Sequence, residues 1–157
     1  MMEQELPDKV EVRYSDNPLE IDPEKNYAPE EDKLKDMQWA DIVFIANILK
    51  YGGPYTARVV GIAKKLGKFV HFDTDDLLTD LYEAHHLYDV YKENKLGDIT
   101  KFCYHNADLV TVTQAKFADR IKPFVGKCLA VVRNVLDYSL PAWNQPKSKA
   151  KFTRIGY

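Results

Sequence analysis

The sequence predicts an α/β domain built on a mainly parallel sheet, and two patterns carry that prediction. Short apolar runs of strand length alternate along the chain with stretches that have helical spacing. The apolar runs are continuous rather than alternating with polar residues, which is typical of strands buried on both faces. Alternation of this kind indicates βαβ units, whose right-handed crossovers give a parallel sheet covered by helices. We therefore expect a Rossmann-like three-layer sandwich.

The composition excludes several classes of protein. The 157 residues suffice for one domain with a real core, and 45% are hydrophobic, 29% are charged and the net charge is −2. This balance gives no general attraction to nucleic acid. No apolar stretch approaches the roughly 20 residues that a membrane-spanning helix needs, and no secretory start is present. We expect a soluble, cytoplasmic protein with no nucleic-acid partner; a peripheral association with a membrane stays open.

The first half of the chain begins with an acidic, proline-punctuated lead-in over residues 1–30, where only Val10–Tyr14 has the alternation of a strand. A helix is expected from Pro29, which has acidic residues behind it. The run Ala40–Ala46 predicts the next strand. Gly52 and Gly53 then permit a sharp turn, and a helix follows that ends at Gly67.

The second half repeats the pattern from the strand that begins at Phe69. We expect a helix directly after that strand, because six residues share one helical face: Leu77, Leu78, Leu81, Tyr82, His85 and Tyr88. Further elements are expected as a helix over Asp98–Ala107, a strand over Leu109–Thr113, a helix from Gln114 to Pro123 and a strand over Lys127–Val132. Cys103 and Cys128 are interpreted as packed thiols on a buried helix face and a buried strand.

Three carboxylates follow the strand that begins at Phe69. Asp73, Asp75 and Asp76 come at its end, and ligands bind outside the carboxyl ends of strands in open parallel sheets. An alternative is that Asp75 or Asp76 caps the helix expected near Leu77. One cap needs one carboxylate, however, and three close together repel one another unless a cation or a hydroxyl-rich ligand answers them. No metal site is expected, because adjacent His85 and His86 would point in different directions on a helix.

Taken in order, six motifs resemble the N-terminal lobe of the two-lobed GT-B glycosyltransferases, of the retaining group 1 kind. The motifs are ADIVFI, YGGP, FVHFDTDDLL, NADLVTVTQAKFADRI, LAVVRNVLDYSLPAW and KFTRIGY, and they span Ala40–Tyr157. Singly they are weak, and their order is the more specific signal. The resemblance implies that residues 31–144 form the lobe, and that residues 145–157 are a linker and the first strand of a C-terminal lobe.

The resemblance further implies transfer of a sugar from a nucleotide-sugar donor to a saccharide or lipid-linked acceptor, as in polysaccharide biosynthesis. Asp73, Asp75 and Asp76 are then the residues that bind or deprotonate acceptor hydroxyls. The acceptor-binding set implied by the resemblance is Gly52, Gly53, His71, Arg133 and Asn134. The nucleotide and its phosphates are expected in the C-terminal lobe, a partner outside this chain, so no cofactor is expected here.

The chain departs from the family pattern in two places. The family's N-terminal lobe opens with a strand and a glycine-containing loop, which Met1–Val10 lacks, and Val135 stands where glycine is common. We therefore expect the chain to lack the first strand unit and the donor lobe, and to be inactive alone.

Two other functions compete with sugar transfer. The DTDD motif resembles that of haloacid-dehalogenase-type phosphohydrolases, with Asp73 as nucleophile and Asp75 as acid/base around Mg²⁺. Leu77 stands where that family usually has threonine, and two strand patterns precede the motif instead of none. The third possibility is a Rossmann-like module that binds a sugar or a protein without catalysis.

Overall fold

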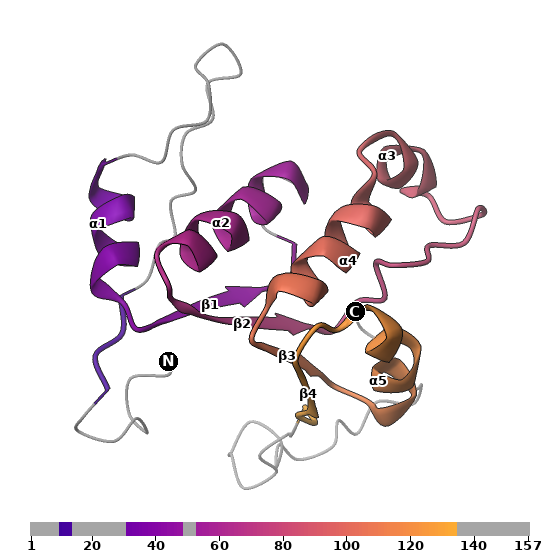
Figure 1. Cartoon of the computed structure of the whole chain (residues 1–157). Coiled ribbons are helices and arrows are strands. Elements are labelled where there is room, and N and C mark those ends of the chain that lie inside the picture. The colour runs from indigo at the N-terminus through magenta and orange to yellow at the C-terminus, as the bar shows by residue number, and fades with distance from the viewer. Residues whose placement is uncertain (1–9, 14–30, 49–52, 135–157) are drawn as a thin grey trace, which may run out of the picture.

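The computed structural model describes residues 10–13, 31–48 and 53–134 (Figure 1). The expectations for Pro29, for the 145–157 linker and for the strand from Phe152 lie outside these ranges. The elements in chain order are α1 (Glu31–Trp39), β1 (Ile42–Ala46), α2 (Gly53–Lys65), β2 (Phe69–Thr74), α3 (Tyr88–Glu93), α4 (Leu96–Asn106), β3 (Leu109–Val112), α5 (Ala115–Ile121), the 3₁₀ helix η1 (Lys122–Phe124) and β4 (Cys128–Val131).

The α/β prediction is confirmed, because the four strands form one all-parallel sheet that is flanked by helices, as in a Rossmann-like sandwich. The strand order is β1-β2-β3-β4, which is also the chain order. In register, Phe44 of β1 pairs with His71 of β2, and Asp73 of β2 pairs with Thr111 of β3. Since every crossover runs in the same direction, the right-handed rule puts the connecting helices α2, α4 and α5 on one face.

The core lies between that face and its helices. Alternation along β2 points Val70, Phe72 and Thr74 to this side, and all three are buried. α2 and α4 lie next to each other over β1 and β2 (Figure 1). The fully buried hydrophobic side chains that fill this layer are Val60, Ala63, Val70, Phe72, Cys103, Tyr104, Ala107, Val110, Val112 and Ile121. This layer is the hydrophobic core that holds the strands in register.

The opposite face of β1 and β2 is apolar and exposed. Ile42 is 60% exposed, Phe44 58% and Phe69 44%, all from the strand positions that point away from α2 and α4. His71 and Asp73 continue the same face toward the carboxyl ends of the strands. The exposed face therefore changes from apolar at the amino end of the sheet to polar at its carboxyl end.

Two glycines have clear structural roles at the two ends of α2. An added Cβ at buried Gly53 would meet Leu96 Cδ2 at 2.8 Å and Ile99 Cδ1 at 2.9 Å, so glycine allows α2 to begin directly against α4. Gly67 adopts a left-handed φ of 70° and donates its N–H to the Lys64 carbonyl at 3.0 Å. It ends α2 as the sequence predicts.

Asp108 ties four elements together at the amino edge of the sheet. Its Oδ2 accepts hydrogen bonds from Lys64 Nζ at 2.6 Å and from the Val70 N–H at 2.8 Å, and its Oδ1 accepts one from Lys127 Nζ at 2.5 Å. Burial raises the pKa of Asp108, but the hydrogen bonds from Lys127, Lys64 and Val70 outweigh burial and hold the pKa well below its ordinary value. The Asp108 carboxylate thus links α2, β2, β3 and the start of β4 through hydrogen bonds to a charged group.

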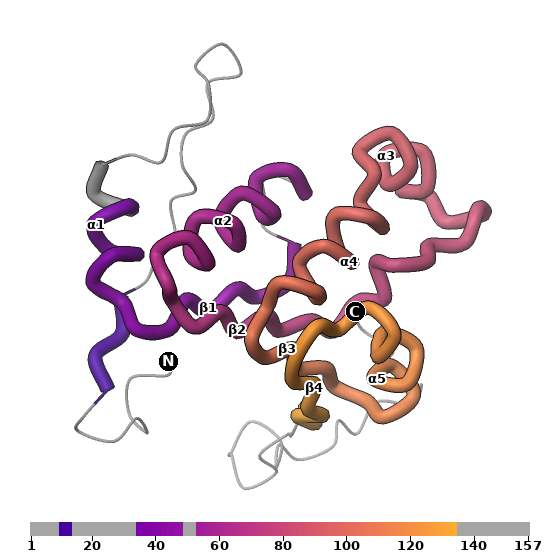
Figure 2. The backbone as a smooth tube through the Cα atoms, in the orientation of Figure 1, coloured from indigo at the N-terminus to yellow at the C-terminus, as the bar shows by residue number. Residues whose placement is uncertain are grey.

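Two expected elements are absent from the described residues. Residues 75–87 contain no helix, and the short α3 is the only helix between β2 and α4. Figure 2 shows this part of the chain leaving the sheet after β2 and returning at α4. Val10–Arg13 is not a strand; the Arg13 guanidinium instead lies 3.9 Å from the centre of the Trp39 ring and 3.0 Å from Asp36 Oδ1. This segment therefore packs beside α1.

The two thiols differ in exposure. Cys103 is fully buried on α4, as expected, and burial raises its pKa to about 12. Cys128 was expected on a buried strand, and this is wrong: β4 is an edge strand and Cys128 is exposed. Both cysteines are free.

Candidate functional site

Polar side chains gather where β1 and β2 end. Asp73 is the fifth residue of β2 and lies between Ala46 of β1 and Thr111 of β3. Asp75 and Asp76 are the first two residues after β2, and both are exposed. The carboxylates expected at the carboxyl edge of the sheet are therefore placed there. We call Asn47, Asp73, Asp75 and Asp76 the carboxyl-edge cluster.

Asn47 connects the two strand ends. Its Nδ2 donates hydrogen bonds to Asp76 Oδ2 at 3.0 Å and to Asp75 Oδ1 at 3.3 Å, and its backbone N–H donates to the Asp73 carbonyl at 2.6 Å. The Asn47 Oδ1 accepts the Ile48 N–H at 2.8 Å. Asn47 holds a φ of 60°, a left-handed conformation that asparagine tolerates better than most residues. One amide thus draws two like-charged carboxylates together, which offsets part of their repulsion.

A turn after β2 sets the positions of Asp75 and Asp76. The buried Thr74 hydroxyl donates to the Asp76 carbonyl at 3.2 Å and accepts the Asp76 N–H at 3.4 Å. The alternative interpretation of Asp75 or Asp76 as a helix cap is wrong, because residues 75–87 contain no helix for either carboxylate to cap. The side chains of Asp75 and Asp76 are left exposed, and Asn47 donates a hydrogen bond to each of the two carboxylates.

Asp73 and His71 share a hydroxyl. Thr111, 3% exposed, donates its hydroxyl to Asp73 Oδ1, and His71 Nε2 lies 2.9 Å from Thr111 Oγ1. The Phe44 ring packs edge-on against the imidazole, with 4.9 Å between ring centres. Burial lowers the pKa of His71, and the negative charge of Asp73 acts in the opposite direction. The hydrogen bond from Thr111 holds Oδ1 of Asp73 in place.

The predicted acceptor-binding residues do not all meet at this point. Arg133 and Asn134 follow β4 at the same edge of the sheet and are exposed. β4 lies two strands from β2, or about 10 Å across the sheet. Gly53 is buried against α4 at the start of α2, so its proximity to α4 explains the glycine without a ligand. Gly52 lies outside the described residues.

Sequence reasoning missed two residues of the site, Asn47 and Thr111. Asn47 directly follows an apolar strand, and asparagine at such a point is a signal for a left-handed turn that ends the strand. Thr111 is one of two threonines in LVTVT, and only the register of β2 against β3 shows that it lies beside Asp73. The first had a readable signal, while the second required the three-dimensional structure.

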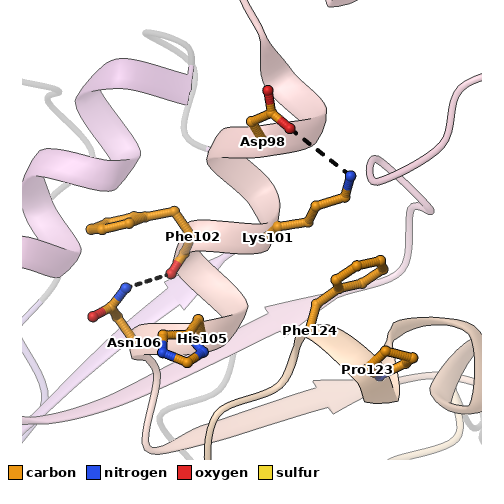
Figure 3. Close-up of a pocket in the computed structure, with 7 residues that line it drawn as sticks. All are labelled: Asp98, Lys101, Phe102, His105, Asn106, Pro123 and Phe124. Carbon is orange, nitrogen blue, oxygen red and sulfur yellow. Dashed lines mark hydrogen bonds and ion pairs between the residues drawn. The ribbon is translucent and has the colours of Figure 1, made fainter.

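A shallow groove of about 370 Å³ lies away from the cluster, between α4 and η1 (Figure 3). Lys101 crosses it, with its Nζ 3.9 Å from Asp98 Oδ1 and 5.1 Å from the centre of the Phe124 ring. The remaining lining residues are Phe102, His105, Asn106 and Pro123. None of these residues belongs to the carboxyl-edge cluster.

Within the described ranges, no three side chains of His, Cys, Asp or Glu come together as ligands for a metal ion. His85 and His86 stack with 4.5 Å between ring centres, and His85 Nδ1 accepts the Leu87 N–H at 3.2 Å.

No helix in the described part of the chain has both the length and the apolar character to cross a membrane.

Comparisons of this chain with family models, curated proteins and solved structures gave no match.

Proposed function

We propose that this chain is the acceptor-side lobe of a two-lobed glycosyltransferase, which transfers a sugar from a nucleotide-sugar donor to a saccharide or lipid-linked acceptor. The observation that carries the proposal is the carboxyl-edge cluster. Asp73, Asp75 and Asp76 lie where parallel strands end, which is the position at which open α/β sheets bind their ligands. The ordered motifs of the sequence support the same family. We further propose that the protein acts in the cytoplasm.

The chemistry of the cluster suits an acceptor that carries several hydroxyl groups. Ionised carboxylates accept hydrogen bonds, and the Asn47 amide adds donors and an acceptor beside them. Asp75 and Asp76 are exposed and Asp73 is half-buried, so the first two are the carboxylates that are most open to a hydroxyl. In the proposed reaction one of them takes the proton from the attacking hydroxyl as the hydroxyl oxygen bonds to the sugar. The bond between the sugar and the donor phosphate breaks, and the nucleotide leaves with its electron pair.

The donor site is proposed to lie in the second lobe. The described residues hold no glycine-rich phosphate loop at the carboxyl edge. Arg133 is the basic residue that follows β4 there. Closure of the two lobes would cover the cluster and exclude water from the reacting groups. Arg133 and Asn134, which follow the last described strand, are the proposed junction.

The test is sugar transfer by this chain joined after Tyr157 to a nucleotide-sugar-binding lobe. Asp75→Asn and Asp76→Asn are expected to lower transfer, whereas Asp119→Asn, an exposed carboxylate on α5, is the matched control and is expected to leave it unchanged. Wild-type transfer by both cluster variants would refute the assigned roles.

Two assays on the 157-residue chain separate the competing functions. Mg²⁺-dependent release of phosphate from p-nitrophenyl phosphate, lost in Asp73→Asn, would assign the chain to the phosphohydrolases. Saturable binding of defined oligosaccharides by the chain, combined with absence of transfer in the joined protein, would assign a binding module instead. The proposal predicts no phosphatase activity, and transfer only when both lobes are present.

A further inference from the structure

The hydrogen bonds between His71, Thr111 and Asp73 have a fixed direction. A threonine hydroxyl has one proton, and Thr111 donates that proton to Asp73 Oδ1. His71 Nε2 lies 2.9 Å from the same hydroxyl oxygen, so Nε2 must carry a proton and donate it to Thr111. The neutral imidazole is therefore the Nε2–H tautomer, and its Nδ1 holds the lone pair.

We propose that Thr111 is a positioning residue of the candidate site, which holds Asp73 Oδ1 through its hydroxyl and leaves Oδ2 directed to the acceptor. His71 acts one step behind it, because its Nε2–H keeps the Thr111 hydroxyl turned toward the carboxylate. This role deepens the proposed function and depends on it. The chain of hydrogen bonds itself does not depend on that function.

The surroundings of the three residues favour a built arrangement over a chance contact. Thr111 is buried at 3% exposure, and the register places it opposite Asp73 on the neighbouring strand. Valine has nearly the same shape and is common in buried strands, but at this position it would leave both Nε2–H and Oδ1 without their partner. The two polar groups therefore require a hydroxyl at position 111, whereas packing alone would accept valine.

The arrangement persists when His71 titrates. The groups around the imidazole are Phe44 from β1, Thr111 from β3 and Asp73 on its own strand. Among the described residues, Asp73 is the charged group that acts on His71. A proton added to His71 binds at Nδ1, so the Nε2–H donor and the Thr111 bridge are present on both sides of the titration. Thr111 thus holds Asp73 in the same orientation whether His71 is neutral or protonated.

The first test is nitrogen-15 NMR of the histidine rings in the 157-residue chain. Wild type is expected to show neutral His71 as the Nε2–H tautomer. Thr111→Val is expected to mix the tautomers and lower the pKa of His71 further, because the charged ring loses its acceptor. Thr111→Ser is expected to restore both properties. Asp73→Asn is expected to lower the pKa as well, because the carboxylate that raises it is gone.

Amide spectra of each variant check that it is folded, and the exposed His105 ring on α4 is the internal reference. A wild-type His71 in the Nδ1–H tautomer would overturn the proposal. So would a folded Thr111→Val whose His71 tautomer and pKa equal those of wild type.

The second test uses transfer by the joined two-lobed protein. Thr111→Val is expected to lower kcat by about 10-fold with KM nearly unchanged, as for loss of one oriented hydrogen bond, and Thr111→Ser is expected to recover it. Loss without recovery by serine would contradict the positioning role. If the NMR results hold while the wild-type joined protein transfers no sugar, the proposed function fails and the hydrogen-bond chain stands.

Discussion

The side-chain amide of Asn47 donates a hydrogen bond to Asp76 Oδ2 at 3.0 Å, from a residue that holds a left-handed φ of 60°. The contact joins the end of β1 to the turn after β2, and it places an amide beside two carboxylates that would otherwise repel each other. Geometry at this strand end therefore depends on both the backbone and the side chain of one residue.

Substitution of Asn47 is expected to separate these two contributions. Asn47→Ala removes the amide and forces a Cβ-bearing residue without a stabilising side chain to keep φ positive, at a cost of about 1–2 kcal/mol. Asn47→Gly removes the amide but accepts the conformation, so it is expected to be the more stable of the two in urea unfolding. An alanine variant at least as stable as the glycine variant would show that the left-handed conformation is not under strain.

Asp108→Asn is expected to destabilise the fold by about 2 kcal/mol near pH 7, because charge-assisted hydrogen bonds to Lys64 and Val70 are weakened. The Lys127 pair adds less, since its side chain is 57% exposed. Urea unfolding of the two proteins at pH 7 measures the difference. A cost below about 0.5 kcal/mol would mean that solvent replaces these contacts without loss.

The effect of Asp108 has a defined dependence on pH. Its folded pKa is lowered, so its contribution is complete above the unfolded pKa of about 3.9 and is lost as the pH falls through the folded value. The stability gap between wild type and Asp108→Asn is therefore expected to be constant from pH 7 to pH 5 and to shrink below pH 4. A gap that widens on acidification would contradict the lowered pKa.

Two phenylalanines on neighbouring strands offer a matched pair for the two faces of the sheet. Phe72 is fully buried, and Phe72→Ala is expected to cost about 3–5 kcal/mol. Phe44 is 58% exposed, and Phe44→Ala is expected to cost less than about 1 kcal/mol. Urea unfolding at one pH measures both. Equal costs would show that the face carrying Phe44 is covered in solution.

The thiols give a further test of the fold. Iodoacetamide is expected to label Cys128 in the native chain and to reach Cys103 only after unfolding, because Cys103 is fully buried and burial raises its pKa to about 12. Mass spectrometry should find one adduct in buffer and two in urea, and Cys128→Ser should show none in buffer. Rapid labelling of Cys103 in buffer would place α4 away from the sheet.

The strands and most helices could be predicted from the sequence because local pattern and burial agree there. Leu109–Val112 is rich in β-branched residues and is buried or half-buried throughout, whereas Cys128–Val131 is apolar and half-buried at its two central residues. The prediction of a helix after Asp76 is wrong, because the apolar spacing of that segment fits a helix but tertiary contacts decide its path. Thr79 is buried there, and the Tyr91 hydroxyl of α3 occupies the space left by Gly97.

The candidate site was predictable only in part, for a related reason. Acidic residues at a strand end can be read along the chain, and Asp73, Asp75 and Asp76 were found in that way. Contacts between strands require the register, which a single sequence does not supply. The pairing of Asp73 with Thr111 is such a contact, and so is the bond between Asn47 and Asp76.

The most direct measurement of the central claim is kcat/KM for sugar transfer by the joined two-lobed protein carrying Asp75→Asn or Asp76→Asn, set beside the same protein carrying Asp119→Asn. If the carboxyl-edge cluster handles the acceptor, both cluster variants lower kcat/KM, the one that removes the base by about 100-fold or more, while Asp119→Asn matches wild type. Wild-type values for both cluster variants would contradict the account.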